Sequence, residues 1–156
     1  MANAGSYGWR TTSWATGPGG TAAVANWIPN AQAIFSATTP PGTLTYDVDI
    51  ASYNTATHGG FGAIRALGGT VRFTGNVDNF YLLANTAVDA APGAAIEFNQ
   101  TRSGNSLLAF NLNSQTVTFD GNVTFNNGGM GNTGNVEVNS GKLALNAANP
   151  YTGSTT

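Results

Sequence analysis

An eight-residue pattern that occurs twice constrains the fold of this chain more than any other feature. Residues 70–77 read TVRFTGNV and residues 116–123 read TVTFDGNV, so six of eight positions are identical at an offset of 46 residues. In each copy two apolar residues alternate with polar ones, and a Gly-Asn pair then precedes a third apolar residue. This order predicts a short strand, a tight corner and the start of a second strand. A looser copy occupies residues 134–145.

Segments with the same strand-like alternation recur along the chain at intervals of about ten residues, the spacing of an all-β array. Glycine-containing pairs that suit corners separate them. A repeated strand-and-corner unit is typical of a solenoid, in which each unit covers the apolar face of the next. The predicted strands are Leu44–Ile50, Gly62–Leu67, Thr70–Phe73, Asn79–Leu83, Ala94–Phe98, Ser106–Leu112, Thr116–Phe119, Asn122–Phe125, Asn135–Val138 and Lys142–Leu145.

A turn of a β-helix takes about 20 to 25 residues, so 46 residues correspond to two turns. We therefore expect the two copies of the pattern to lie two turns apart on the same face, within about five turns in all. Phenylalanines on the apolar phase of these strands should form stacked rows in the core rather than a carbohydrate platform. These are Phe73, Phe98, Phe110, Phe119 and Phe125.

Residues 1–42 differ from the rest of the chain. They contain all three tryptophans, Trp9, Trp14 and Trp27, together with four of the six prolines, and they show little sustained alternation. Bulky aromatic side chains are a common cover for the open end of a solenoid. The sequence predicts an N-terminal cap over residues 1–42 and β-helix turns over residues 43–156, within a single structural domain.

The composition excludes several classes of partner. Only 8% of the 156 residues are charged, against about 25% in a typical globular protein, and the net charge is −2. There is no basic stripe for nucleic acid, no apolar run long enough to insert this segment into a membrane, and no cysteine for a disulfide or a thiolate metal site. A low-charge surface rich in Asn, Thr and Gly is typical of extracellular β-structure. The first residues of the sequence lack the basic start and the apolar run of a signal peptide.

Residues 141–156 read GKLALNAANPYTGSTT. This stretch resembles the autotransporter-associated β-strand repeat, whose usual form is GxLxLxxxNxYTGxTT. The stretch from Trp14 through the Asn26-Trp27 pair and Pro29 to Phe35 resembles the opening segment of autotransporter passenger proteins. The resemblance implies a right-handed parallel β-helix that is secreted or displayed on a bacterial cell surface.

The chain departs from that family after the final Thr-Thr pair, where the usual repeat continues into another strand and this sequence stops at Thr156. It also shows no sequence similar to the membrane domain that exports a passenger. An uncovered last turn would leave backbone N–H and C=O groups unpaired, which is a template for another chain. We therefore expect head-to-tail homo-oligomers or filaments as one mode of association.

Catalytic chemistry has few candidates. Asp47 and Asp49 lie on one face of a predicted strand, where they could hold a calcium ion or act as an acid/base pair, and His58 is the single histidine. A solvated strand face and a loop histidine without a chemical role are the favoured interpretations. The sequence therefore assigns no catalytic, cofactor-binding or metal-binding residue and no cofactor.

The expected function is a non-enzymatic extracellular structural or adhesive β-solenoid module, with rows of Asn, Thr and Ser facing a glycan or a host surface. One alternative is a self-assembling fibre or surface-layer subunit that polymerises through the open end turns of the β-helix. A second is a polysaccharide-cleaving β-helix enzyme that uses Asp47, Asp49 and His58.

Overall fold

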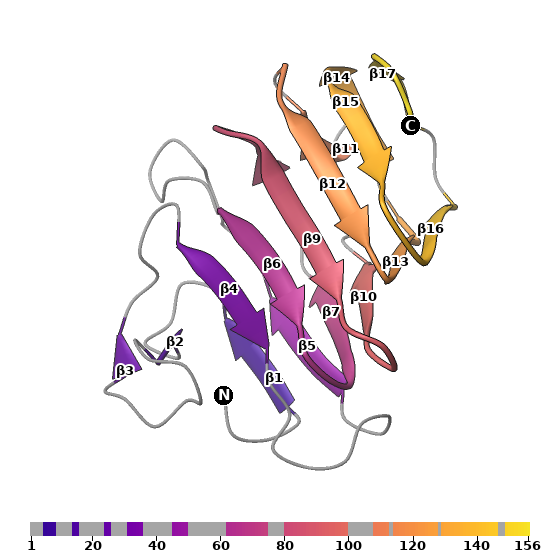
Figure 1. Cartoon of the computed structure of the whole chain (residues 1–156). Helices are drawn as coiled ribbons and strands as arrows, with labels where there is room; N and C mark the ends of the chain where they lie inside the picture. Colours follow the sequence, from indigo (N-terminus) through magenta and orange to yellow (C-terminus); the bar gives the residue numbers. More distant parts are fainter. Residues whose placement is uncertain are drawn as a thin grey trace.

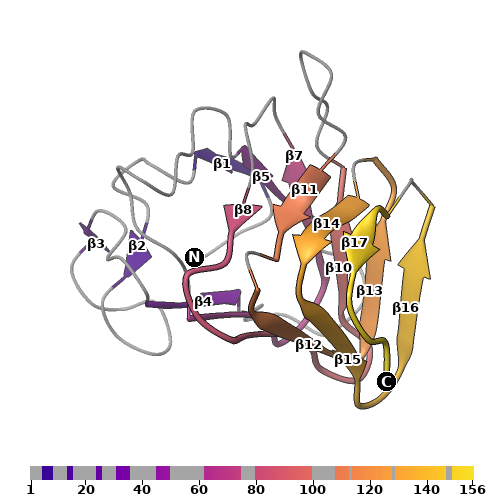
Figure 2. The same cartoon turned by 90° about the horizontal axis from the view of Figure 1, so that it is seen from above.

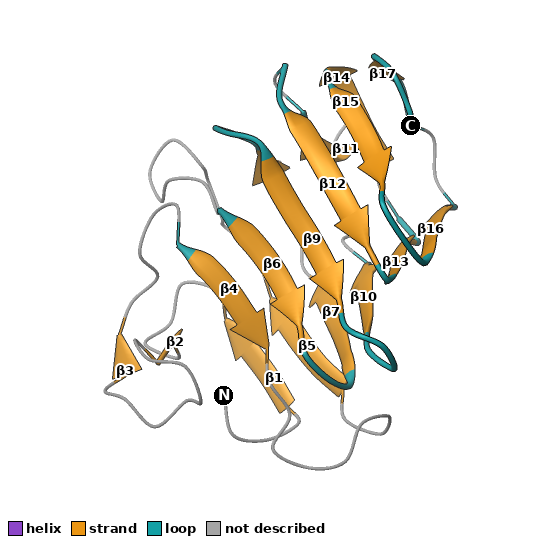
Figure 3. Ribbon diagram, in the orientation of Figure 1, coloured by secondary structure: helices purple, strands orange, loops and turns teal. Residues whose placement is uncertain are grey.

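The protein is all-β in the part of the chain that the structure, a computed structural model, describes (Figure 3). Among the described residues, no helix has the length and hydropathy that crossing a membrane requires. The described ranges are 5–8, 14–15, 24–25, 31–35, 45–49, 62–74, 80–99, 108–112, 114–127, 129–146 and 149–156.

Three parallel sheets form the body of the molecule (Figure 1). The six-strand sheet contains, in order, β1 (Gly5–Gly8), β5 (Thr45–Asp49), β7 (Thr70–Thr74), β10 (Ala95–Phe98), β13 (Asn122–Phe125) and β16 (Lys142–Leu145). The five-strand sheet contains β4 (Gln32–Phe35), β6 (Ala63–Ala66), β9 (Thr86–Ala90), β12 (Thr116–Asp120) and β15 (Asn135–Val138). The four-strand sheet contains β8 (Phe80–Tyr81), β11 (Leu108–Asn111), β14 (Gly129–Thr133) and β17 (Tyr151–Thr152).

The chain visits the three sheets in a constant order, from the five-strand sheet to the six-strand sheet and then to the four-strand sheet. We call one such passage a coil. Four consecutive coils are described, β6–β8, β9–β11, β12–β14 and β15–β17, and Figure 2 shows their strands in three separate stacks. Each coil pairs in parallel with the next, for example Val117 with Val136 and Ile96 with Val123.

All ten predicted strands are confirmed, with ends that shift by no more than a few residues. The sequence prediction missed three strands in these coils, β9, β14 and β17. Strand β9 reads TAVDA and β14 reads GMGNT, so small residues weaken the alternation. The pairing of β14 with β11 is also irregular between Leu108 and Phe110.

The expected position of the repeated eight-residue pattern is wrong. Its first copy forms β7 in the six-strand sheet, whereas its second copy forms β12 in the five-strand sheet and turns into β13. A strand with Val and Phe on its inward side fits either sheet equally well, because alternation specifies a face of a strand and not a sheet. Coil length also varies, since Thr86 pairs with Val117 but Val117 pairs with Val136.

Glycines form the corner between the five-strand and six-strand sheets in every described coil. Gly69, Gly93, Gly121 and Gly141 all have positive φ, between 69° and 85°, a region that other L-residues rarely adopt. At Gly121 a side chain would also overlap the carbonyl oxygen of Ala90 in the coil below. Four of the glycine-containing pairs expected at corners therefore form them, Gly68-Gly69, Pro92-Gly93, Gly121-Asn122 and Ser140-Gly141. At Gly121 and Gly141 the close stacking of coils also leaves no room for a side chain.

The core lies between the sheets and is filled by columns of side chains from successive coils. Phe73, Phe98 and Phe125 stack in the six-strand sheet, with ring centroids 5.1 Å and 4.5 Å apart. Phe35 and Phe119 meet this column edge-on from the five-strand sheet. All five rings are at most 1% exposed, so the predicted inward direction of Phe73, Phe98, Phe119 and Phe125 is confirmed. The side chain of Phe110 lies outside the described residues.

The N-terminal 42 residues contribute strands to both large sheets. Strand β1 pairs with β5, and β4 pairs with β6. A short antiparallel pair, β2 (Trp14–Ala15) with β3 (Val24–Ala25), stands apart from the three stacks (Figure 1). Trp9 and Trp27 lie outside the described residues. The cap over residues 1–42, with its boundary before the turns of residues 43–156, stays a prediction.

Candidate functional site

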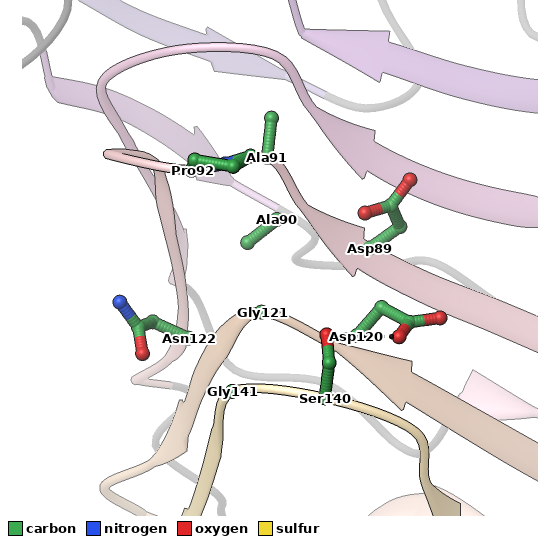
Figure 4. A pocket seen from close by; sticks show the side chains of 9 residues that line it. All are labelled: Asp89, Ala90, Ala91, Pro92, Asp120, Gly121, Asn122, Ser140 and Gly141. Carbon is green, nitrogen blue, oxygen red and sulfur yellow. Dashed lines mark hydrogen bonds between the residues drawn. The ribbon is translucent and has the colours of Figure 1, made fainter.

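A hollow with a volume of about 400 Å³ lies along the glycine corner, where three successive coils pass from the five-strand to the six-strand sheet. Figure 4 shows the side chains of Asp89 and Asp120 together on one flank of it, with Pro92 and Asn122 on the other. Acidic, hydroxyl and amide groups therefore share one concave surface with small apolar side chains. The lining residues are Asp89, Ala90, Ala91, Pro92, Asp120, Gly121, Asn122, Ser140 and Gly141.

The two carboxylates face outward at the ends of their strands. Asp89 is the last outward-facing residue of β9 and precedes the buried Ala90, and Asp120 is the last residue of β12 and immediately precedes Gly121. The two residues are directly in register on β9 and β12. Neighbouring strands lie about 4.8 Å apart, so like charges at these positions repel each other.

Each carboxylate has its own donors, which offset this repulsion. Arg65 is in register with Asp89, and its Nε donates to Asp89 Oδ2 at 2.8 Å. Asp120 Oδ1 accepts from Ser140 Oγ at 3.1 Å, and its Oδ2 accepts from Asn139 Nδ2 at 3.4 Å. The Arg65 and Asp89 side chains are 45% and 28% exposed, so their ion pair is worth at most about 1 kcal/mol.

The hollow offers hydrogen-bonding groups to a ligand. Within the described ranges, no group of three or more His, Cys, Asp or Glu residues could hold a metal ion. The oxygens of Asp89 and Asp120 and the amide of Asn122 instead offer acceptors and a donor to a hydroxyl-bearing molecule. This arrangement can position a polar ligand at the surface.

The acidic residues considered from the sequence do not belong to this hollow. Asp47 and Asp49 lie on β5 of the six-strand sheet, where they are in register with Arg72 and Thr74 of β7. His58 lies outside the described residues. The structure therefore brings neither Asp47 nor Asp49 to the hollow, whose lining comes from later coils.

The sequence prediction missed Asp89 and Asp120 as a pair. A usable signal was present, because each follows an apolar residue at the end of a strand and precedes a small residue at the corner, in Val88-Asp89-Ala90 and Phe119-Asp120-Gly121. The signal became readable only once β9 and β12 were known to be neighbours in one sheet.

A second polar surface runs along the other end of the six-strand sheet, where Asn99, Asn126 and Asn146 form what we call the asparagine ladder. Asn126 Nδ2 donates to Asn99 Oδ1 at 2.7 Å, and Asn146 Nδ2 donates to Asn126 Oδ1 at 3.0 Å. The backbone N–H groups of these three asparagines, in the order given, donate to the carbonyl oxygens of Phe73, Phe98 and Phe125. The ladder therefore repeats one side-chain contact from coil to coil.

No protein-family model matches the chain, and comparison with curated proteins and with solved structures finds no significant similarity.

Proposed function

We propose that the chain is a segment of a right-handed parallel β-helix that acts as a non-enzymatic structural or adhesive module, secreted by a bacterium or displayed on its surface. The observation that carries the proposal is the repetition of side-chain columns through consecutive coils. Val71, Ile96, Val123 and Leu143 occupy one register position of the six-strand sheet, while the asparagine ladder occupies another.

Stacked coils favour a structural role because each coil is stabilised by contacts with adjacent coils alone. In such an array stability is a sum of terms for single repeats and for contacts between adjacent repeats, so length is added without redesign of a global core. The alternating burial of β7, β10 and β12 keeps apolar side chains inside and leaves Thr, Arg and Glu outside. A stiff element with polar outer faces follows from this arrangement.

The proposed bacterial surface location rests on the resemblance of residues 141–156 to the autotransporter-associated β-strand repeat. Within this stretch, Leu143 and Leu145 lie in β16 of the six-strand sheet, and Tyr151 and Thr152 form β17 of the four-strand sheet. Thr155 then bridges to Val136 of the five-strand sheet. The stretch therefore contributes residues to each of the three sheets in turn, as a repeat that forms one coil requires.

The outer faces supply the adhesive part of the proposal. The hollow at Asp89 and Asp120 presents hydrogen-bonding groups without a described metal cluster, and the asparagine ladder adds amide groups on another face. Hydroxyl-rich ligands such as glycans are recognised by such groups. A glycan or a host-surface ligand is therefore the partner that we assign to these faces.

Size-exclusion chromatography with light scattering, negative-stain electron microscopy and a reducing-end assay on a panel of polysaccharides test this function together. A module predicts small particles of finite size and no release of reducing ends. Cleavage of any polysaccharide would contradict the non-enzymatic role, and loss of that cleavage in an Asp47→Asn, Asp49→Asn double variant would establish the enzyme alternative.

The second candidate function is a self-assembling fibre or surface-layer subunit. It is favoured by the parallel pairing of successive coils, such as β12 with β15, because the same backbone pairing could join coils of two copies. Head-to-tail addition of copies would make open polymers. Filaments that lengthen with protein concentration in the same micrographs would support this candidate over the isolated module.

A further inference from the structure

We propose that Asn122 is an N-glycosylation site, at which a transferase links a sugar to the side-chain nitrogen. The acceptor pattern for this modification is Asn-x-Ser/Thr, in which x is not proline. It occurs twice in the chain, as Asn99-Gln100-Thr101 and as Asn122-Val123-Thr124. The structure distinguishes the two, because it engages the side chain of Asn99 and leaves that of Asn122 exposed. The inference goes beyond the proposed structural role and does not depend on it.

Strand β13 presents both recognised residues of the second pattern on one surface. Asn122 and Thr124 occupy alternate positions on its outer side, about 7 Å apart along the strand. Val123 lies between them, points inward and is 1% exposed. Asn122 is exposed and Thr124 is half-buried. An enzyme can therefore contact the acceptor amide and the threonine hydroxyl from the same side, without opening the strand.

Asn122 is exposed although its strand is an inner strand of the sheet. Strand β13 pairs with β10 on one side and with β16 on the other, and Asn122 is in register with Ala95 and Lys142. The methyl group of Ala95 is too small to cover the Asn122 amide. No hydrogen bond from the side chain of Asn122 or of Thr124 to another described residue is found. Both polar groups can therefore meet an enzyme without first leaving a partner.

The other acceptor, Asn99, belongs to the asparagine ladder and is held at both ends of its amide. It is half-buried. Its Nδ2 donates to Glu97 Oε2 at 3.3 Å, and its Oδ1 accepts from Asn126 Nδ2 at 2.7 Å. The amide would have to give up both contacts before its nitrogen could attack a sugar. We therefore expect the folded chain to be modified at Asn122 and not at Asn99.

The sugar donor is a glycosyl phosphate or diphosphate, which is activated at its anomeric carbon. Asn122 Nδ2 forms a bond to that carbon, while the bond between the carbon and the phosphate oxygen breaks and the phosphate leaves with the electron pair. A base on the transferase takes one of the two amide protons. The products are an N-linked sugar and the free phosphate or diphosphate.

The hollow at the glycine corner leaves room for the attached sugar. Asn122 is one of its lining residues, and its volume of about 400 Å³ is in the range of sites that hold small ligands. Asp89 and Asp120 lie on the flank opposite Asn122 (Figure 4), and their carboxylate oxygens can accept charge-assisted hydrogen bonds from sugar hydroxyls. A sugar on Asn122 would therefore lie against polar groups of the same corner, where it would compete with a free glycan.

Transfer of glucose from UDP-glucose by a soluble N-glycosyltransferase specific for Asn-x-Ser/Thr tests the site on the folded chain. The enzyme is first shown to be active on a peptide with an unrelated acceptor. Intact-mass spectrometry and peptide mapping should then find a single added hexose, on Asn122. Asn122→Gln and Thr124→Ala should both fold, as checked by far-UV circular dichroism, and should remove the modification. Thr124→Ser should retain it, because serine keeps the hydroxyl.

Asn99→Gln is the matched control, since it removes the other acceptor and should leave the added hexose unchanged. Peptide mapping of the chain from the organism that produces it is an independent readout, in which Asn122 should carry a sugar and Asn99 should be bare. A bare Asn122 in either sample, or a sugar on Asn99 of the folded chain, would overturn the proposed site. Such a result would leave the structural module itself intact.

Discussion

At the scale of single residues, the corner glycines determine how closely coils can stack. Gly121 has a φ of 79°, and a Cβ there would overlap the backbone carbonyl of Ala90. A left-handed conformation costs a non-glycine residue about 1–2 kcal/mol, and the overlap adds to that cost. We expect Gly121→Ala to lower the free energy of unfolding by more than about 2 kcal/mol, measured by urea denaturation. The exposed neighbour is the control, since Asn122→Ala should change stability by less than about 0.5 kcal/mol.

The asparagine ladder makes a second prediction at the same scale. Asn126 both donates to Asn99 and accepts from Asn146, and a net hydrogen bond contributes about 0.5–1.5 kcal/mol. Asn126→Ala should therefore destabilise the protein by about 1–2 kcal/mol. Asn127 is the same residue type at the next position and is exposed, and no side-chain hydrogen bond to another described residue is found for it. If Asn127→Ala were as costly as Asn126→Ala, the ladder would have no special role in stability.

At the scale of the strand, a charged side chain should disrupt folding at an inward position and be tolerated at an outward position. Val117 is fully buried on β12, and its column continues through Val136. A carboxylate at this position would be buried without a partner. We expect Val117→Asp to abolish cooperative thermal unfolding, whereas Ala87→Asp on the exposed side of the neighbouring strand should retain it. An unchanged melting temperature in the Val117 variant would show that β12 does not face the core.

Most strand positions and their burial could be predicted from the sequence, except for β9, β14 and β17, while the assignment of strands to sheets could not. Val71 and Phe73 have the same pattern as Val117 and Phe119, and all four are buried, because alternation alone specifies which side faces the core. Their sheets differ because coil length differs. Coil length depends on the loops, and the amino-acid composition of a loop does not indicate which strands will pair. The hollow was missed for the same reason, since Asp89 and Asp120 become neighbours only through the pairing of β9 with β12.

At the scale of the whole molecule, the repeated register predicts that coils are interchangeable units. Asn122 is in register with Lys142, Val123 with Leu143 and Phe125 with Leu145. Residues 122–141 therefore make one complete coil, from the start of β13 to the corner before β16. A second copy of these residues between Gly141 and Lys142 would meet the same register and the same corner on both sides.

The measurement that tests this central claim most directly is the thermal unfolding and small-angle X-ray scattering of that duplication variant, at a concentration at which the chain is monomeric. We predict a single cooperative transition at or above the melting temperature of the unaltered chain, and a longest dimension greater by about 4.8 Å, one strand spacing. A melting temperature that falls by several degrees, a second transition, or an unchanged longest dimension would contradict the account of the protein as a stack of equivalent coils.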